Sequence, residues 1–160
     1  MPQAVFARRF HSFKQKAFIL VLPLLSCMSA WSLTGVPQNL QTVELQAGLY
    51  KIKAMAATTA EQRSTGLKFR KEMKPHEGML FIFDAPAQQC FWMKNTLLPL
   101  SAAFIQEDGT VVNVADMQPQ TLDPHCSKKP VRFVLEMNKG WFQKRGLTEG
   151  ARLKGAMFQP

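Results

Sequence analysis

The segment from Trp92 to Thr96 combines an aromatic ring with three polar side chains, a mixture that small-ligand pockets use. On an extended strand, Trp92, Lys94 and Thr96 would share one face, and Asn95 would lie on the other. Trp92 could then stack on a ligand while Lys94 or Asn95 contacts the polar end of that ligand. The alternative interpretation is that the aromatic residues belong to the core and that Asn95 satisfies a turn.

Two arginines upstream could add charge recognition to such a pocket. Guanidinium groups bind carboxylate or phosphate through two parallel hydrogen bonds, so Arg63 and Arg70 could form an anion clamp. In the alternative interpretation they pair with Glu136 or with backbone carbonyl groups. The candidate ligand-binding residues are therefore Arg63, Arg70, Trp92, Lys94, Asn95, Thr96 and Glu136.

The spacing Met73-x-x-His76-x-x-Met79 offers soft ligands of the kind that copper proteins use. Pro75 interrupts any regular helix through this segment, because proline lacks a backbone N–H group. Met79 also opens an apolar stretch that is typical of a core strand. We therefore keep a soft-metal site as an alternative, and we predict no cofactor.

Catalytic constellations are weakly supported by the sequence. His125-Cys126 would supply a base beside a thiol, but neighbouring side chains on an extended chain point apart. Asp84, Asp116 and Glu136 could act as acid and base, but nothing in their spacing places two of them together. A binding role is therefore favoured, and an enzyme of unknown reaction type stays an alternative.

The N-terminus has the pattern of a secretory signal peptide. Basic residues at positions 8, 9, 14 and 16 precede an apolar run at 17–25, which is shorter than the roughly 20 residues of a membrane-spanning helix. Small residues predict cleavage after Ser32, which gives a periplasmic or secreted protein. Residues 24–27 also resemble a lipobox, in which residues 1–26 are removed and Cys27 carries a lipid anchor. Either product has no predicted transmembrane span.

Export changes how the cysteines and the charge are interpreted. An oxidising compartment favours a disulfide between Cys90 and Cys126, which would close a loop of about 36 residues. Residues 1–32 carry four of the 20 basic residues and none of the 11 acidic ones, so the net charge falls from +9 to +5. The remaining basic residues are scattered, which argues against a nucleic-acid partner.

Alternating apolar residues and turn signals predict one β-rich domain at residues 42–160, after a polar linker at 33–41. The expected strands are residues 42–46, 50–54, 78–84, 90–96, 100–106, 110–116, 131–137 and 152–158. Asp108-Gly109 predicts a hairpin with a type I′ turn. The long stretch at residues 117–130 is expected to be a loop. The fold class is α+β and β-dominated, a mostly antiparallel partial barrel or sandwich.

Two short helices are expected beside these eight strands. Thr58 and Thr59 each have a glutamate or glutamine three residues later, which predicts a capped helix that ends at Gly66. Asn138 is expected to cap a second helix at residues 139–145.

Several motifs together resemble the domain of unknown function family 192. They are Arg63-x-x-Gly66-Leu67-x-x-Arg70, Gly78-Met79-Leu80-Phe81-x-Phe83, Phe91-Trp92-Met93-Lys94-Asn95-Thr96-x-x-Pro99-Leu100, Asp108-Gly109-x-Val111, and Val134-Leu135-Glu136 with Gly140. The similarity runs from about Val43 to Phe158 and implies a compact β-rich domain, often exported, without an established activity. The family often has Asp where this chain has Ser101, which weakens any role for an essential carboxylate there.

These patterns together predict an exported domain of the cell envelope. We expect it to bind a small polar or anionic ligand, or an envelope protein partner, beside Trp92–Thr96.

Overall fold

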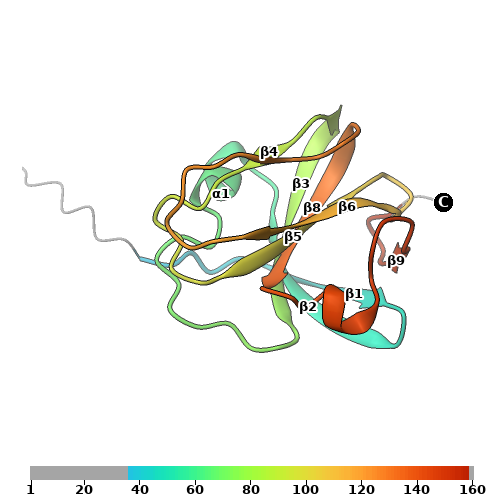
Figure 1. The fold of residues 1–160 in the computed structure, drawn as a ribbon, viewed down its shortest axis with the longest axis horizontal. Coiled ribbons are helices and arrows are strands. Elements are labelled where there is room, and N and C mark those ends of the chain that lie inside the picture. Colours follow the sequence, from blue (N-terminus) through green and yellow to red (C-terminus); the bar gives the residue numbers. More distant parts are fainter. Residues whose placement is uncertain (1–35, 159–160) are drawn as a thin grey trace, which may run out of the picture. The chain divides into compact units, whose positions relative to one another are not determined.

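A computed structural model of the chain describes residues 36–158, so the predicted signal peptide and Cys27 lie outside the described residues. Within this range the structure is β-dominated (Figure 1). The elements are β1 (Thr42–Ala47), β2 (Tyr50–Ala57), α1 (Ala60–Thr65), β3 (Glu77–Ala87), β4 (Cys90–Phe91), β5 (Leu100–Ile105), β6 (Val111–Met117), β7 (His125–Cys126), β8 (Val131–Asn138), the 3-10 turn η1 (Gln143–Arg145) and β9 (Leu153–Lys154). No helix in this range is both long and apolar enough to span a bilayer.

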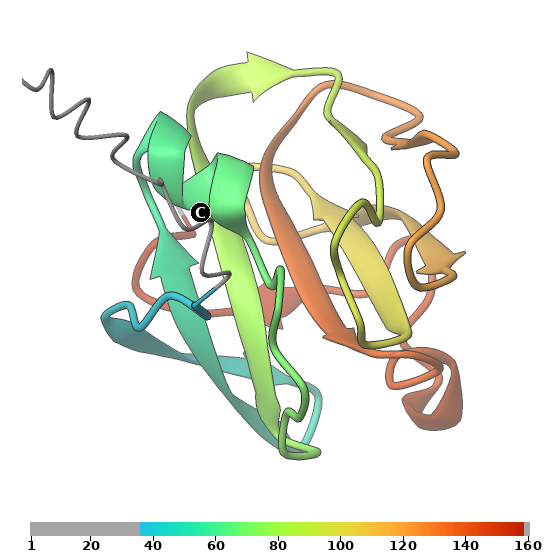
Figure 2. The same ribbon diagram turned by 90° about the vertical axis from the view of Figure 1, so that its left-hand side faces the viewer.

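Seven of the strands form one curled sheet in the order β6-β5-β8-β3-β2-β1-β9, and β4 pairs with β7 in a second, small sheet. All strand pairs in these sheets are antiparallel except β2–β3. That pair is parallel because α1 and the chain after it form the crossover that parallel strands require. Figure 2 shows α1 beside β2 and β3. The predicted partial barrel, mostly antiparallel, is confirmed.

The interior strand β8 contributes side chains to two buried clusters, one on each face of the sheet. Leu135 belongs to one cluster, and Val134 belongs to the other together with Phe81. Because successive side chains on a strand point to opposite faces, Glu136 lies on the same face as Val134. A carboxyl group is therefore placed on the sheet face that carries Phe81.

The first predicted helix is confirmed. Thr59 is the N-cap of α1. Its side-chain oxygen accepts a hydrogen bond from the backbone N–H of Gln62, and the backbone N–H of Thr59 donates to the side-chain oxygen of Gln62. Gly66 ends the helix with φ 54°, a conformation that favours glycine.

The second predicted helix is wrong, since only the turn η1 forms there. Asn138 does not cap it. Its side-chain amide instead donates to the carbonyl oxygens of Met73 and Lys74, at 3.0 Å and 3.3 Å. The side chain that was expected to cap the helix therefore binds the loop before β3. The short turn η1 ends at Gly146, which has the left-handed conformation.

The strand predicted at residues 90–96 ends after Phe91, so the shared face proposed for Trp92, Lys94 and Thr96 does not exist. The chain turns instead, because Asn95 has φ 62° and the Thr96 N–H donates to the Met93 carbonyl. The strand predicted at 152–158 is also shorter, and covers only β9.

Two connections differ from expectation. The hairpin at Asp108-Gly109 forms, but only Gly109 has positive φ, at 87°, so the turn is not type I′. The stretch at 117–130 is not all loop, because Cys126 and its neighbour His125 pair with β4.

Candidate functional site

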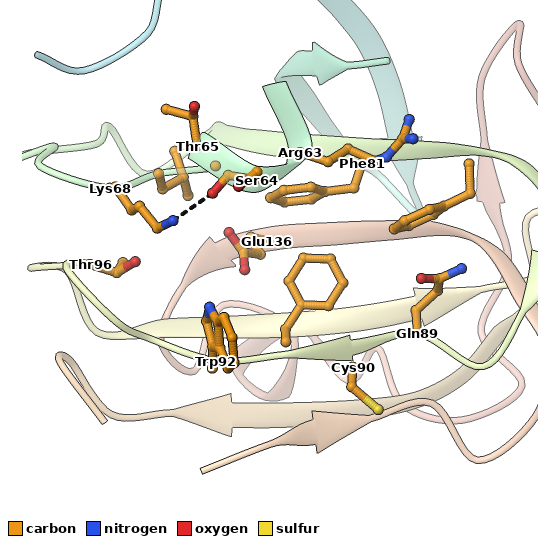
Figure 3. A pocket seen from close by; sticks show the side chains of 14 residues that line it. Arg63, Ser64, Thr65, Lys68, Phe81, Gln89, Cys90, Trp92, Thr96 and Glu136 are labelled. Carbon is orange, nitrogen blue, oxygen red and sulfur yellow. Dashed lines mark hydrogen bonds between the residues drawn. The ribbon is translucent and has the colours of Figure 1, made fainter. Parts of the chain in front are cut away.

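A cavity of about 270 Å³ opens between α1 with its following turn on one side and β4 with Trp92 on the other (Figure 3). Strands β3 and β8 supply its inner wall through Phe81, Phe83 and Glu136. The cavity therefore lies at the meeting point of segments that are far apart in the sequence.

Glu136 is the buried polar group of this cavity. It lies on the interior strand β8, directly opposite Met79 of β3 and Ala102 of β5, and it is 4% exposed. Among the described residues, no side chain or backbone group forms a hydrogen bond or ion pair with its carboxyl group. Desolvation by burial raises the pKa of Glu136 from 4.5 to about 8. The carboxyl group is therefore largely protonated at neutral pH and faces the cavity without a protein partner (Figure 3).

Aromatic rings form much of the remaining wall. Phe81 and Phe91 meet edge to face with their ring centroids 4.7 Å apart, and Phe83 lies farther along β3. Trp92 also lines the cavity but is 60% exposed, so its ring is available to a ligand from solvent. Such rings offer stacking surfaces and exclude water from the polar group beside them.

Polar side chains on two further segments complete the lining. Thr96 is 6% exposed, and its backbone oxygen accepts a hydrogen bond from Gln120, which fixes the turn that carries it. Lys68 is half-buried, and its ammonium group donates to the Ser64 carbonyl oxygen at 2.6 Å. The α1 side of the cavity therefore carries positive charge, while the buried acid lies on the sheet.

The two candidate arginines do not form an anion clamp. Arg63 lines the cavity, but its guanidinium group donates to the carbonyl oxygens of Thr58 and Ile82 and lies 5.0 Å from the ring centroid of Phe83. Arg70 is not part of the lining. It donates to the carbonyl oxygen of Gln38 at 3.0 Å. The arginines thus bind backbone carbonyl groups, as the alternative interpretation proposed, and neither pairs with Glu136.

Lys94 and Asn95 also lie outside the cavity lining, and both are exposed. The backbone oxygen of Asn95 accepts a hydrogen bond from the Phe69 N–H at 3.0 Å, so this residue shapes the turn. The structure thus brings together Arg63, Trp92, Thr96 and Glu136, and it leaves Arg70, Lys94 and Asn95 elsewhere.

Cys90 and Cys126 form the predicted disulfide, with their Cα atoms 4.0 Å apart. They face each other in the β4–β7 pair, and Cys90 lines the cavity. The bond therefore anchors the wall that carries Phe91 and Trp92. It also leaves no free thiol for the nucleophile that His125-Cys126 could have supplied.

The remaining candidates for chemistry lie apart. Met79 is fully buried among apolar side chains, whereas His76 is exposed in the preceding loop. Asp84 is exposed on β3, and Asp116 accepts a hydrogen bond from Ser101, which lies on the opposite sheet face from Glu136. Among residues 36–158 no three His, Cys, Asp or Glu side chains gather as a metal site would require.

Several lining residues were not predicted from the sequence, namely Ser64, Thr65, Lys68, Phe81, Phe83 and Gln89. One signal was available, because the run 131–137 is apolar apart from Arg132 and Glu136. An acidic residue on the buried face of such a strand indicates either a cavity or a buried ion pair. The sequence of the turn after α1 contains no comparable pattern that would predict its place in the cavity.

The sequence profile of DUF192, described as an uncharacterized ACR, matches residues 41–155. Similar solved structures include a Sinorhizobium meliloti 1021 protein that is provisionally described as a transcription regulator. It is 35% identical, with a TM-score of 0.69 over 76% of this chain and 97% of that chain. A protein of unknown function from Novosphingobium aromaticivorans DSM 12444 is 32% identical, with a TM-score of 0.69 over 72% of this chain and 86% of that chain. No curated protein sequence matches the chain. The matched region contains the entire cavity lining, and the chain belongs to the DUF192 family.

Proposed function

We propose that this DUF192 protein is an exported binding module that holds a small polar ligand in the cavity between Trp92 and Glu136. The observation that carries the proposal is the carboxyl group of Glu136, which is 4% exposed, faces the cavity and has no partner among the described residues. A group of this kind is satisfied when a ligand supplies the missing hydrogen-bond donor or charge.

Burial disfavours the ionised form of Glu136, which supports a functional role. Burying a polar group without a hydrogen bond costs on the order of 1–3 kcal/mol in proteins. The residues directly opposite, Met79 and Ala102, are apolar, and an apolar side chain at position 136 would pack against them without this cost. Perturbed titratable groups in clefts are candidates for function on the same grounds.

The size and lining of the cavity favour a small molecule over a protein partner. Its volume of about 270 Å³ lies just below the range of ordinary ligand pockets, which begins at about 300 Å³. Its lining combines aromatic walls with a few polar groups, and the ring of Trp92 lies at the solvent-exposed part. The lining contains one carboxyl group and no histidine, so Glu136 does not meet Asp84 or a histidine in this cavity, as the enzymatic alternative would require.

Export to the cell envelope is part of the proposal. It rests on the basic and apolar N-terminal segment in the sequence, and the Cys90–Cys126 disulfide is of a kind that persists in oxidising compartments. Two mature forms are compatible with this proposal, a soluble protein cleaved after Ser32 and a lipoprotein anchored through Cys27.

A thermal-shift panel tests the binding proposal. The probes are monosaccharides, dicarboxylates, nucleosides, primary amines and amino acids, each added to the disulfide-bonded protein. We expect at least one class to raise the melting temperature, because a ligand that binds the folded state stabilises it. The same probe should have less effect on Trp92→Ala. The proposal fails if no class shifts the wild-type melting temperature, or if every shift is unchanged in Trp92→Ala.

A further inference from the structure

The charges around the cavity are arranged in a way that restricts the ligand. The inner wall carries the acid Glu136, while Lys68 and Arg63 lie on the α1 side. No other charged side chain lines the cavity, and the neighbours of Glu136 on β3 and β5 are Met79 and Ala102. The carboxyl group of Glu136 and the basic groups of Lys68 and Arg63 therefore lie on different walls of the cavity, and no ion pair joins them among the described residues.

We infer, on the basis of the proposed function, that the ligand is a zwitterion of the amino-acid type, with its ammonium group on Glu136 and its carboxylate on Lys68. This assignment gives each charged end of the ligand an opposite charge in the protein. It also places the apolar part of the ligand against the aromatic wall.

The ammonium end fits the surroundings of Glu136. An ammonium group supplies three hydrogen-bond donors, whereas the carboxyl group of Glu136 has no donor from the described residues. The rings of Phe81, Phe91 and Trp92 border the same space, and aromatic rings attract cations when water is excluded. A neutral hydroxyl group would satisfy a hydrogen bond there but would not use this electrostatic field.

The carboxylate end fits Lys68 better than Arg63. The guanidinium group of Arg63 is already bound to two carbonyl oxygens and stacked on Phe83. The ammonium group of Lys68 makes a hydrogen bond to the Ser64 carbonyl oxygen, which leaves two of its three N–H donors for a ligand. A ligand that was only an amine would meet repulsion from these two basic residues.

The protonation of Glu136 separates this inference from its main competitor. An ammonium ligand favours the ionised carboxylate and expels the proton that Glu136 holds at neutral pH. With a pKa of about 8, affinity should rise about 50-fold from pH 6 to pH 8, and binding at pH 7 should release about 0.9 proton. A simple carboxylate ligand would accept a hydrogen bond from protonated Glu136, so its affinity would not rise over this range.

The experiment begins with a thermal-shift screen of the proteinogenic L-amino acids at pH 8. The best binder is then compared by calorimetry with its decarboxylated amine and its deaminated acid. For leucine these are 3-methylbutylamine and 4-methylpentanoate. We expect the amino acid to bind at least tenfold more tightly than either analogue. Glu136→Gln should reduce its affinity to that of the deaminated acid, and Lys68→Met should reduce it to that of the amine.

Lys94→Met is the matched control, because Lys94 is an exposed lysine outside the cavity lining and its loss should leave the affinity unchanged. The inference is overturned if no amino acid binds, if either analogue binds as tightly as the amino acid, or if affinity falls between pH 6 and pH 8. If a monosaccharide or nucleoside binds and its binding depends on Trp92, the inference of a zwitterionic ligand is overturned, whereas the proposed function is supported. Failure of the whole panel would overturn both.

Discussion

Glu136 lies directly opposite Met79 across the β3–β8 pair. The carboxyl group therefore belongs to a residue whose neighbour on β3 is apolar and fully buried. Its other partner across β5 is Ala102, whose small side chain is also fully buried. The acid is thus enclosed by the sheet on both sides and is open only toward the cavity. The stability and the binding properties of the protein both depend on this arrangement.

The pH dependence of stability follows from the raised pKa of Glu136. In the unfolded chain this group ionises near pH 4.5, whereas in the folded protein it keeps its proton up to about pH 8. Unfolding between these values releases a proton, so the contribution of Glu136 to stability decreases as the pH rises. Glu136→Gln lacks this proton equilibrium. The free energy of unfolding of the variant should therefore exceed that of the wild type by on the order of 4 kcal/mol at pH 8, and by much less at pH 5.

Urea denaturation of both proteins at pH 5, 6, 7 and 8 measures this difference. If the free energies of unfolding of wild type and Glu136→Gln run parallel across this range, Glu136 is not a desolvated acid.

Trp92→Ala should separate binding from stability. The side chain of Trp92 is 60% exposed, so its loss removes little buried surface, and the free energy of unfolding should change by less than about 1 kcal/mol. The thermal shift caused by a cavity ligand should decrease strongly. Leu67→Ala provides the contrast, because Leu67 is 2% exposed and its truncation should cost about 2–5 kcal/mol. A large loss of stability in Trp92→Ala would assign that ring to the core.

The disulfide should contribute substantially to stability. Cys90 and Cys126 are separated by 36 positions, and closing a loop of this size stabilises the folded state by about 4 kcal/mol in the chain-entropy model. Cys90→Ser combined with Cys126→Ser should lower the free energy of unfolding by about this amount. Since the bond anchors the wall that carries Trp92, ligand affinity should decrease as well. Alkylation and mass spectrometry of protein from the cell envelope should detect no free thiol at these positions, and two free thiols would contradict the bond.

Cys27 distinguishes the two mature forms proposed for the exported protein. If Cys27 carries a lipid, Cys27→Ser should move the protein from the membrane fraction to the soluble envelope fraction. If cleavage follows Ser32, the wild type and the variant should both be soluble, with a mature N-terminus at residue 33. Fractionation with N-terminal sequencing decides between the forms, and protein found in the cytoplasm with an intact N-terminus would refute export altogether.

Features set by local sequence could be predicted well. The capped helix depends on Thr59 and Gln62, which are three residues apart and bond each other directly. The pairing of Cys90 with Cys126 followed from the number of cysteines and the proposed compartment, without knowledge of the sheet. The β-dominated half-barrel was likewise predicted from the strand pattern, because the alternation of apolar and polar residues along a strand indicates which of its faces is buried.

The cavity depended on contacts between distant segments, so its lining was predicted only in part. The turn that replaces the predicted strand after Phe91 is held by a hydrogen bond from Met93 N–H to the Thr121 carbonyl oxygen at 3.0 Å. No pattern in the sequence near Met93 predicts that hydrogen bond, because its acceptor lies in a distant segment. For the same reason Lys68 was missed, since its place in the cavity is set by the crossover from β2 to β3. Glu136 was named as a candidate ligand-binding residue and, in the alternative interpretation, as a partner for the arginines. The structure places it in the cavity lining and pairs it with neither arginine.

Nuclear magnetic resonance of the side chains of Glu136 and Trp92 tests the binding account most directly. Carbon-13 labels on the glutamate carboxyl groups report the ionisation of Glu136, and the indole N–H signal reports Trp92, while the amino-acid probes are added. We predict that Glu136 titrates near pH 8 without ligand, that its pKa falls when a ligand binds, and that both signals move together. A Glu136 pKa near 4.5 without ligand, or binding that leaves both signals in place, would contradict the account.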